Sequence, residues 1–179
     1  MHRDGDPGVT AVVDVVVTYL ELDLATDATA WHAVPLPDLR REPPDSAPTM
    51  AAVMYRAVGG PWHWTDRLTW TESEWNEAVN RPDVELWIAR IGGDVAGYFE
   101  LHVEARGVEL KYFGLMPEFT GRRIGGAFLA AAIDRARQLG KARMTVNTCT
   151  LDHPAALPNY LKRGFTVVKT EPSHRTVSA

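Results

Sequence analysis

The sequence predicts a single α+β domain built around a mixed, mostly antiparallel sheet with helices packed against it. Two observations lead to this class. Between residues 84 and 115, strand-like segments follow one another with only short turns between them, which is typical of antiparallel pairing. From residue 124 onward, helical and strand-like segments alternate instead, which favours a right-handed crossover between two parallel strands. The sheet is therefore expected to be mixed.

The composition limits the class of protein before any motif is considered. With 179 residues, 45% of them hydrophobic and 23% charged, the chain fits one domain whose core needs no disulfide. Its single cysteine, Cys149, forms no intramolecular disulfide and suits a reducing compartment. The first residues lack the features of a signal peptide, no apolar run is long enough to span a membrane, and the formal net charge is -4. We therefore expect a cytoplasmic protein without nucleic-acid or membrane partners.

The N-terminal half is predicted to form a strand, an irregular stretch and two helices. Residues 9–22 are rich in valine and threonine, which favour a strand, whereas residues 23–48 contain five prolines and are expected to be irregular. A helix is predicted from about Thr49, because apolar residues recur there with helical spacing. After an aromatic loop, Thr71 and Glu74 form a capping box that predicts the start of a second helix.

The C-terminal half supplies the rest of the sheet. The predicted segments are a hairpin of 84–91 and 95–103, a strand at 108–115, a helix at 124–139, a strand at 142–148, a helix at 154–163 and a strand at 165–169. Phe128, Ala132, Ala136 and Leu139 are expected on the inner face of the long helix. The strands on either side of the short helix are the pair expected to be parallel. The ends, 1–8 and 171–179, are expected to be loose.

The most informative segment is a turn rich in glycine and arginine before the long helix, with the sequence FGLMPEFTGRRIGGA from Phe113 to Ala127. The first N–H groups of a helix have no carbonyl partner, and the helix dipole adds positive charge there, so such a turn can cradle a pyrophosphate. The glycines Gly121, Gly125 and Gly126 have no Cβ to keep an anion away, and Arg122 and Arg123 add positive charge.

This turn resembles the acetyl-CoA motif of the GNAT N-acetyltransferases, in which V-x-P is followed by Q/R-x-x-G-x-G/A and a helix. Counted from Pro117, Thr120 takes the Q/R position, and Arg123 and Gly125 take the two glycine positions. Thr120 and Arg123 therefore depart from the pattern. A register two residues later, with Arg122, Gly125 and Ala127, matches all three letters but lengthens the loop. The Pro-anchored register is preferred because its spacing is the usual one.

A second motif supports the resemblance. Residues 153–165, HPAALPNYLKRGF, are similar to the family's N-x-x-A-x-x-x-Y-x-K-x-G-F pattern, with His153 at the asparagine position and Ala156, Tyr160, Lys162, Gly164 and Phe165 in place. The order of elements over residues 9–170 also agrees with the GNAT fold, so the resemblance covers nearly the whole chain. It implies a sheet whose parallel pair splays apart at the cofactor site.

The resemblance implies an N-acyltransferase that transfers an acetyl or short acyl group from acetyl-CoA, or another acyl-CoA, to a primary amine in a ternary complex. Its cofactor site would comprise the pantetheine-binding backbone of Phe113, Gly114 and Leu115 and the pyrophosphate-binding residues Thr120, Gly121, Arg122, Arg123, Ile124, Gly125 and Gly126. Tyr160 takes the position of the family's tyrosine general acid. Glu109 takes the position of a glutamate that, in some family members, deprotonates the amine through a water molecule. Glu100 is the second candidate for this base.

The resemblance also implies where the acceptor, a small-molecule amine or a peptide, would bind. Trp62, His63 and Trp64, together with Glu100, are its candidate contacts, and aromatic walls suit an apolar or cationic group. Trp70 belongs to the same loop, and core packing is an equal alternative for these tryptophans. The six histidines show no metal-ligand spacing. A homodimer stays open because dimers are common among such enzymes.

Other interpretations of the same residues compete with these roles. Tyr160 also suits helix packing, and a strand glutamate such as Glu109 also suits cross-strand pairing. Cys149 has no evident base partner that would make it an acyl-accepting nucleophile. The same fold also serves a catalytically silent acyl-CoA-binding module, which needs no acid or base, or an acyl-CoA decarboxylase, which releases carbon dioxide.

Overall fold

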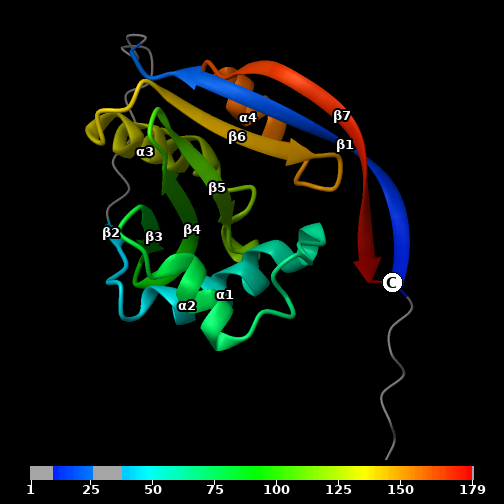
Figure 1. The fold of residues 1–179 in the computed structure, drawn as a ribbon, viewed down its shortest axis with the longest axis horizontal. Helices are drawn as coiled ribbons and strands as arrows, with labels where there is room; N and C mark the ends of the chain where they lie inside the picture. The colour runs from blue at the N-terminus through cyan, green and yellow to red at the C-terminus, as the bar shows by residue number, and fades with distance from the viewer. Residues whose placement is uncertain (1–9, 26–37, 179) are drawn as a thin grey trace, which may run out of the picture.

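A seven-stranded mixed sheet organises the chain, in the strand order β2-β3-β4-β5-β6-β1-β7 (Figure 1). The computed structural model describes residues 10–25 and 38–178. The strands are β1 (Thr10–Asp23), β2 (Asp38–Arg41), β3 (Val84–Ile91), β4 (Asp94–Val103), β5 (Gly107–Leu115), β6 (Arg143–Cys149) and β7 (Thr166–Ser178). Each neighbouring pair is antiparallel except β5 and β6, which confirms the predicted mixed sheet with one parallel pair.

Helices cover both faces of this sheet and create two hydrophobic cores. The helices are α1 (Ala47–Gly59), α2 (Glu72–Val79), α3 (Gly125–Gln138) and α4 (Ala156–Lys162), with short 3-10 turns η1 (Gly60–Trp62) and η2 (Pro117–Phe119). Successive side chains of a strand point to opposite faces, so along β4 Phe99 and Leu101 pack with α3 and α4, whereas Tyr98 packs with α1 and α2. The predicted inner face of the long helix is confirmed, since Phe128, Ala132 and Ala136 are fully buried.

The position of β1 differs from what the local sequence suggests. It lies between β6 and β7 and pairs with both in antiparallel fashion, and the long β1–β7 ribbon curves away from the rest of the sheet (Figure 1). The strands on either side of α4 therefore run in the same direction, as predicted, but they are not neighbours. The inserted strand comes from the other end of the sequence, and local patterns carry no information about such a pairing.

Two further segments correct the sequence-based boundaries. β7 continues to Ser178, paired with Thr10 of β1, so residues 171–178 are an ordered strand rather than a loose end. Within the stretch 23–48, which was expected to be irregular, the short strand β2 pairs with β3. Residues 1–8, the other expected loose end, lie outside the described residues.

The capping box before α2 is confirmed. The Thr71 hydroxyl accepts a hydrogen bond from the Glu74 N–H at 3.3 Å, and Glu74 Oε2 accepts one from the Thr71 N–H at 2.6 Å. We expect Thr71→Ala to lower the free energy of unfolding by about 1 kcal/mol, because the substitution leaves a helix N–H without its acceptor. Urea denaturation measures this difference, with the exposed Thr69→Ala as a control that should change stability by less than about 0.5 kcal/mol.

Candidate active site

A cleft opens where β5 leaves β6. The two strands pair only over residues 107–109 and 143–145. In the β4–β5 pairing, Leu101 lies opposite Leu110 and Glu100 lies opposite Tyr112, so Lys111 is an extra residue that forms a bulge. A bulge bends its strand and changes which face the following side chains occupy, which moves β5 away from β6. The resulting cleft has a volume of about 900 Å³.

The turn after β5 carries a row of unpaired backbone donors at one end of this cleft. Within the described part of the chain, none of the N–H groups of residues 121–127 donates a hydrogen bond, and the first helical bond of α3 runs from Phe128 N–H to the Ile124 carbonyl at 2.9 Å. The residue before α3, Ile124, provides no side-chain cap. These N–H groups and the positive end of the helix dipole therefore form a site that suits a phosphate group.

The backbone of this turn agrees with the Pro-anchored register of the motif. Gly121 and Arg123 have positive φ angles of 80° and 62°. A left-handed residue is expected at the first glycine position, and this register places Arg123 there. In the later register the last small residue would be Ala127, which lies inside α3. Of the two arginines, Arg123 lines the cleft, whereas the Arg122 guanidinium stacks on Phe119 at 4.7 Å.

Helix α4 fixes the start of α3 through contacts that the sequence did not reveal. Asn159 donates to the Gly125 carbonyl at 3.2 Å, and Arg163 Nε donates to the Gly126 carbonyl at 2.7 Å. A Cβ on Gly126 would lie 2.0 Å from Nη2 of Arg163. The Arg163 guanidinium therefore fills the space beside the Gly126 Cα, and a side chain there would displace the end of this flexible arginine. Gly126 also lines the cleft, and its expected role beside an anion stays a prediction.

Tyr160 occupies the interior end of the cleft. The residue is 5% exposed and lines the cleft, with its ring against Phe113 and Phe165. Its hydroxyl makes no hydrogen bond to any other residue that the structure describes. Burial, with a smaller contribution from the negative charge of Asp152, holds the pKa of this phenol well above its usual value. Tyr160 is therefore a neutral hydroxyl that faces the cleft.

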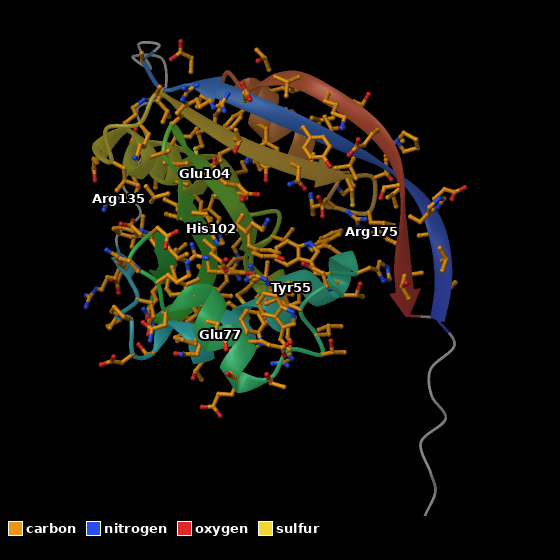
Figure 2. All side chains as sticks on the ribbon, viewed as in Figure 1. Tyr55, Glu77, His102, Glu104, Arg135 and Arg175 are labelled. Atoms are coloured by element: carbon orange, nitrogen blue, oxygen red, sulfur yellow. The ribbon has the colours of Figure 1, made fainter. Side chains whose placement is uncertain are left out.

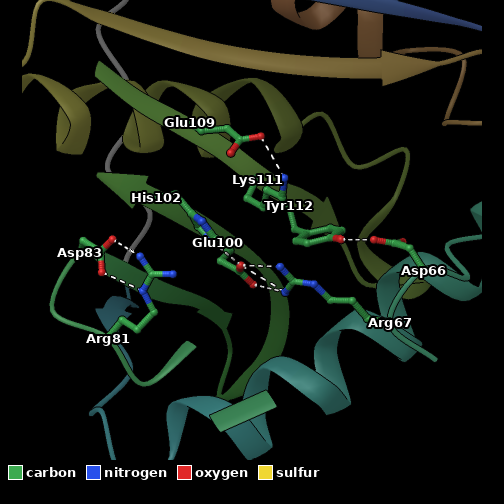
Figure 3. Close-up of polar contacts among 9 residues, drawn as sticks. All are labelled: Asp66, Arg67, Arg81, Asp83, Glu100, His102, Glu109, Lys111 and Tyr112. Carbon is green, nitrogen blue, oxygen red and sulfur yellow. Dashed lines mark hydrogen bonds and ion pairs between the residues drawn. The ribbon is translucent and has the colours of Figure 1, made fainter. Parts of the chain in front are cut away.

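The two candidate bases lie outside the cleft, which corrects their expected positions. Glu109 precedes the point of splaying, and its carboxylate pairs with Lys111 Nζ at 3.1 Å (Figure 3). Glu100 is 1% exposed and belongs to the α1–α2 face, where it accepts hydrogen bonds from the Arg67 guanidinium at 3.0–3.2 Å and contacts His102 Nε2 at 2.6 Å. Neither carboxylate lines the cleft, so we assign neither of them to the amine, and Glu100 is not an acceptor contact.

The aromatic loop divides between the cleft and the core. Trp62, His63 and Trp64 line the cleft as expected, with Trp62 against His153 at 4.9 Å. Trp70 instead packs on Trp75 and on the Arg67 guanidinium, inside the α1–α2 core. Both alternatives that the sequence left open therefore apply: Trp62 lines the cleft, Trp70 packs against the α1–α2 core, and Trp64 does both.

Two aspartates of the cleft were missed by the sequence analysis. Asp66 follows the aromatic loop and accepts hydrogen bonds from the hydroxyls of Tyr55 and Tyr112. Asp152 accepts from Trp64 Nε1, from the Thr148 hydroxyl and from the Cys149 N–H. A single aspartate in a loop has no sequence signature, although Asp66 adjoins an aromatic run that was already assigned to the acceptor site.

Comparison with known proteins decides the family. The model of the acetyltransferase (GNAT) family matches residues 47–165, which is more than half of the chain. The chain belongs to the GNAT family. No match was found among curated proteins. In the residues that the structure describes, there is no group of side chains suited to hold a metal ion, and no helix there has the length and apolar character that crossing a bilayer requires.

Solved structures share the GNAT fold at low sequence identity. A GCN5-related N-acetyltransferase from Sphaerobacter thermophilus is 16% identical with a TM-score of 0.66, over 92% of this chain and 52% of that one. An aminoglycoside acetyltransferase from an uncultured soil metagenomic sample is 12% identical with a TM-score of 0.58, over 71% and 86%. The PaiA N-acetyltransferase from Thermoplasma acidophilum is 19% identical with a TM-score of 0.54, over 79% and 98%. This GNAT chain thus spans about half the length of the Sphaerobacter protein.

Proposed function

We propose that this GNAT protein transfers an acetyl or short acyl group from acyl-CoA to a primary amine of a small molecule or peptide. The observation that carries the proposal is the row of unpaired N–H groups at residues 121–127, which lies at the mouth of a cleft between two splayed strands. A diphosphate supplies the acceptor oxygens that these donors lack.

The cleft offers sites for two parts of coenzyme A, the diphosphate and the pantetheine. The diphosphate would bind the turn of Thr120 to Gly126, and the pantetheine would bind along Phe113, Gly114 and Leu115, whose edge towards β6 is free of strand pairing. When bound, acyl-CoA supplies a thioester carbonyl that an amine can attack. We propose that the hydroxyl of Tyr160, which lines the cleft, donates its proton to the departing thiolate.

The acceptor end of the cleft contains aromatic rings and carboxylates but neither candidate glutamate base. We therefore propose that the acceptor amine reacts after it has lost its proton to solvent, rather than to Glu109 or Glu100. Two structural neighbours are consistent with an amine acceptor and with coenzyme A, because an aminoglycoside acetyltransferase was solved in complex with sisomicin and PaiA was solved in complex with coenzyme A. A cytoplasmic location suits the lone cysteine and remains part of the proposal.

The direct experiment is to incubate the purified protein with acetyl-CoA and a panel of primary amines. Release of free thiol, together with a mass increase of one acetyl group on the amine, is the expected result. Binding of acetyl-CoA without thiol release for any amine would instead support the silent acyl-CoA-binding module, and carbon dioxide release would support the decarboxylase. No binding of acetyl-CoA at high micromolar concentration would contradict all three.

A further inference from the structure

Asp66 presents a fixed carboxylate at the acceptor end of the cleft. Its Oδ2 accepts a hydrogen bond from the Tyr112 hydroxyl at 2.6 Å, as Figure 3 shows. Its Oδ1 accepts one from the Tyr55 hydroxyl at 2.5 Å. The residue is exposed and lines the cleft. Each oxygen of an ionised carboxylate has a second lone pair, so both can accept a further hydrogen bond from a ligand.

The environment keeps this carboxylate negatively charged. Partial burial favours the protonated form, but the hydroxyls of Tyr112 and Tyr55 outweigh it and hold the pKa of Asp66 below its usual value. Both hydroxyls donate to the carboxylate, because burial and the neighbouring anion raise the pKa of each phenol. Asp66 is therefore an anion at neutral pH.

A buried ion pair holds the loop that carries Asp66. The next residue, Arg67, is 4% exposed, and its guanidinium makes hydrogen bonds to both oxygens of Glu100 on β4. The same guanidinium lies over the rings of Trp70 and Tyr112, at 4.5 and 4.4 Å from their centroids. Asp66 thus lines the cleft from a loop whose next residue is anchored against the α1–α2 core.

Aromatic rings lie beside the Asp66 carboxylate, whereas the Asp152 carboxylate already accepts several hydrogen bonds from the protein. Trp64 packs on Tyr112 at 5.0 Å and on Tyr55 at 5.6 Å, which gives the site walls that suit a cation. The Asp152 carboxylate accepts hydrogen bonds from Trp64, Thr148 and Cys149, so its lone pairs are largely used within the protein. Of the two aspartates, Asp66 is the better partner for a ligand.

Basic side chains also line the cleft, and they define the alternative in which the distal group of the acceptor is negatively charged. Lys111 pairs with Glu109, which leaves it less able to repel a cation. Arg175 lines the cleft from β7 (Figure 2), where its guanidinium donates to Ser173 and to the His174 carbonyl. A carboxylate on the acceptor would favour Arg175, and an ammonium would favour Asp66, so the distal group of the acceptor distinguishes the two.

We propose that Asp66 binds a second, positively charged amino group of the acceptor, so that the substrates are small molecules with at least two amines. One amine is acetylated after it loses its proton, and the distal ammonium stays charged between Asp66 and the aromatic rings of Trp64 and Tyr112. This inference rests on the proposed acetyl transfer, but it assigns the acceptor class and the residue that selects it.

The test compares three acceptor series of equal chain length: α,ω-diaminoalkanes, monoaminoalkanes and ω-amino acids. Thiol release from acetyl-CoA gives kcat/KM for each acceptor. We expect the best diaminoalkane to exceed its monoamine and amino-acid counterparts by at least about tenfold, as expected for a charge-assisted hydrogen bond near the surface. We expect Asp66→Asn to lower kcat/KM for the diaminoalkane by at least about tenfold, mainly through KM, and to lower it much less for the monoamine, which has no distal ammonium to bind.

The control is Asp94→Asn, because Asp94 is an exposed aspartate at the first position of β4, outside the cleft lining. This variant should keep the parent's preference for diamines. The inference is wrong if the parent acetylates the monoamines or the amino acids as well as the diamines, or if Asp66→Asn lowers kcat/KM equally for all three series. In either case acetyl transfer itself still stands, whereas an absence of thiol release with every amine would overturn the proposed function.

Discussion

Tyr160→Phe is expected to lower kcat by about 100-fold while the Kd for acetyl-CoA stays within about twofold of the parent. General acid catalysis by a positioned side chain contributes roughly 100- to 10,000-fold, and the lower end suits a thiolate, which is a fairly good leaving group. The substitution removes only the hydroxyl and leaves the ring that packs on Phe113 and Phe165. Steady-state kinetics on an accepted amine and calorimetry with acetyl-CoA measure the two quantities.

The pH dependence of activity and a control substitution at Tyr19 test the same role of Tyr160. Because burial and Asp152 raise the pKa of Tyr160, its phenol stays protonated through the range in which an acceptor amine loses its proton. Activity should therefore rise with pH and show no fall near pH 10, the ordinary pKa of tyrosine. Tyr19→Phe is the matched control, since Tyr19 also lines the cleft but its hydroxyl donates to Glu171 at 2.7 Å. Equal kcat values for Tyr160→Phe and the parent would remove the acid role.

Glu100→Gln is expected to lower the free energy of unfolding by about 3–5 kcal/mol. The substitution leaves the Arg67 guanidinium, which is 4% exposed, without its counter-charge, and an uncompensated buried charge costs about that much. Urea denaturation at neutral pH measures the loss. The control is Glu109→Gln on the neighbouring strand, because the Glu109–Lys111 pair is partly exposed and should contribute at most about 1 kcal/mol.

The stability difference should depend on pH in a defined direction. Desolvation raises the pKa of Glu100, but hydrogen bonding to His102 and the charge of Arg67 outweigh it, so the folded-state pKa lies below the usual value. A depressed carboxylate pKa stabilises the fold fully above the unfolded-state pKa of about 4.3, and this contribution is lost as pH falls through the folded-state pKa. The gap between the parent and Glu100→Gln should therefore shrink below about pH 4. A gap that stays constant down to pH 3 would contradict this origin.

Local patterns predicted several elements, the turn at the cofactor end among them, because the determinants of these elements are local. The capping box of Thr71, the inner face of α3 and the turn before α3 each depend on residues within one or two helical turns. The positive φ of Arg123 shows that an arginine can take the expected glycine position of that turn. The motif therefore predicted the position of the unpaired N–H groups, although Thr120 and Arg123 depart from its pattern.

Local patterns did not predict where Glu109 and Glu100 lie relative to the cleft, because non-local strand pairing determines their positions. The bulge at Lys111 changes which face of β5 each later side chain occupies, so the distance of Glu109 from Leu115 in sequence does not give its position in the cleft. Glu100 points to the α1–α2 face because of the alternation of β4, and its partner Arg67 comes from a distant loop. The insertion of β1 beside β6 likewise joins residues more than 100 positions apart.

The central claim is that the N–H groups of residues 121–127 hold the diphosphate of coenzyme A, and calorimetry with a matched pair of variants tests it most directly. A Cβ at Gly125 would make only an ordinary contact, 3.8 Å from Leu115, and an aspartate at the start of a helix favours the helix, so Gly125→Asp and Gly125→Asn should both fold. Both variants add a Cβ where the anion approaches the backbone, so both should bind coenzyme A more weakly than the parent. The negative charge of Gly125→Asp should weaken binding by at least about a further tenfold relative to the isosteric Gly125→Asn, through repulsion of the diphosphate. Equal affinities for both variants and the parent would show that the diphosphate binds elsewhere and would contradict the account.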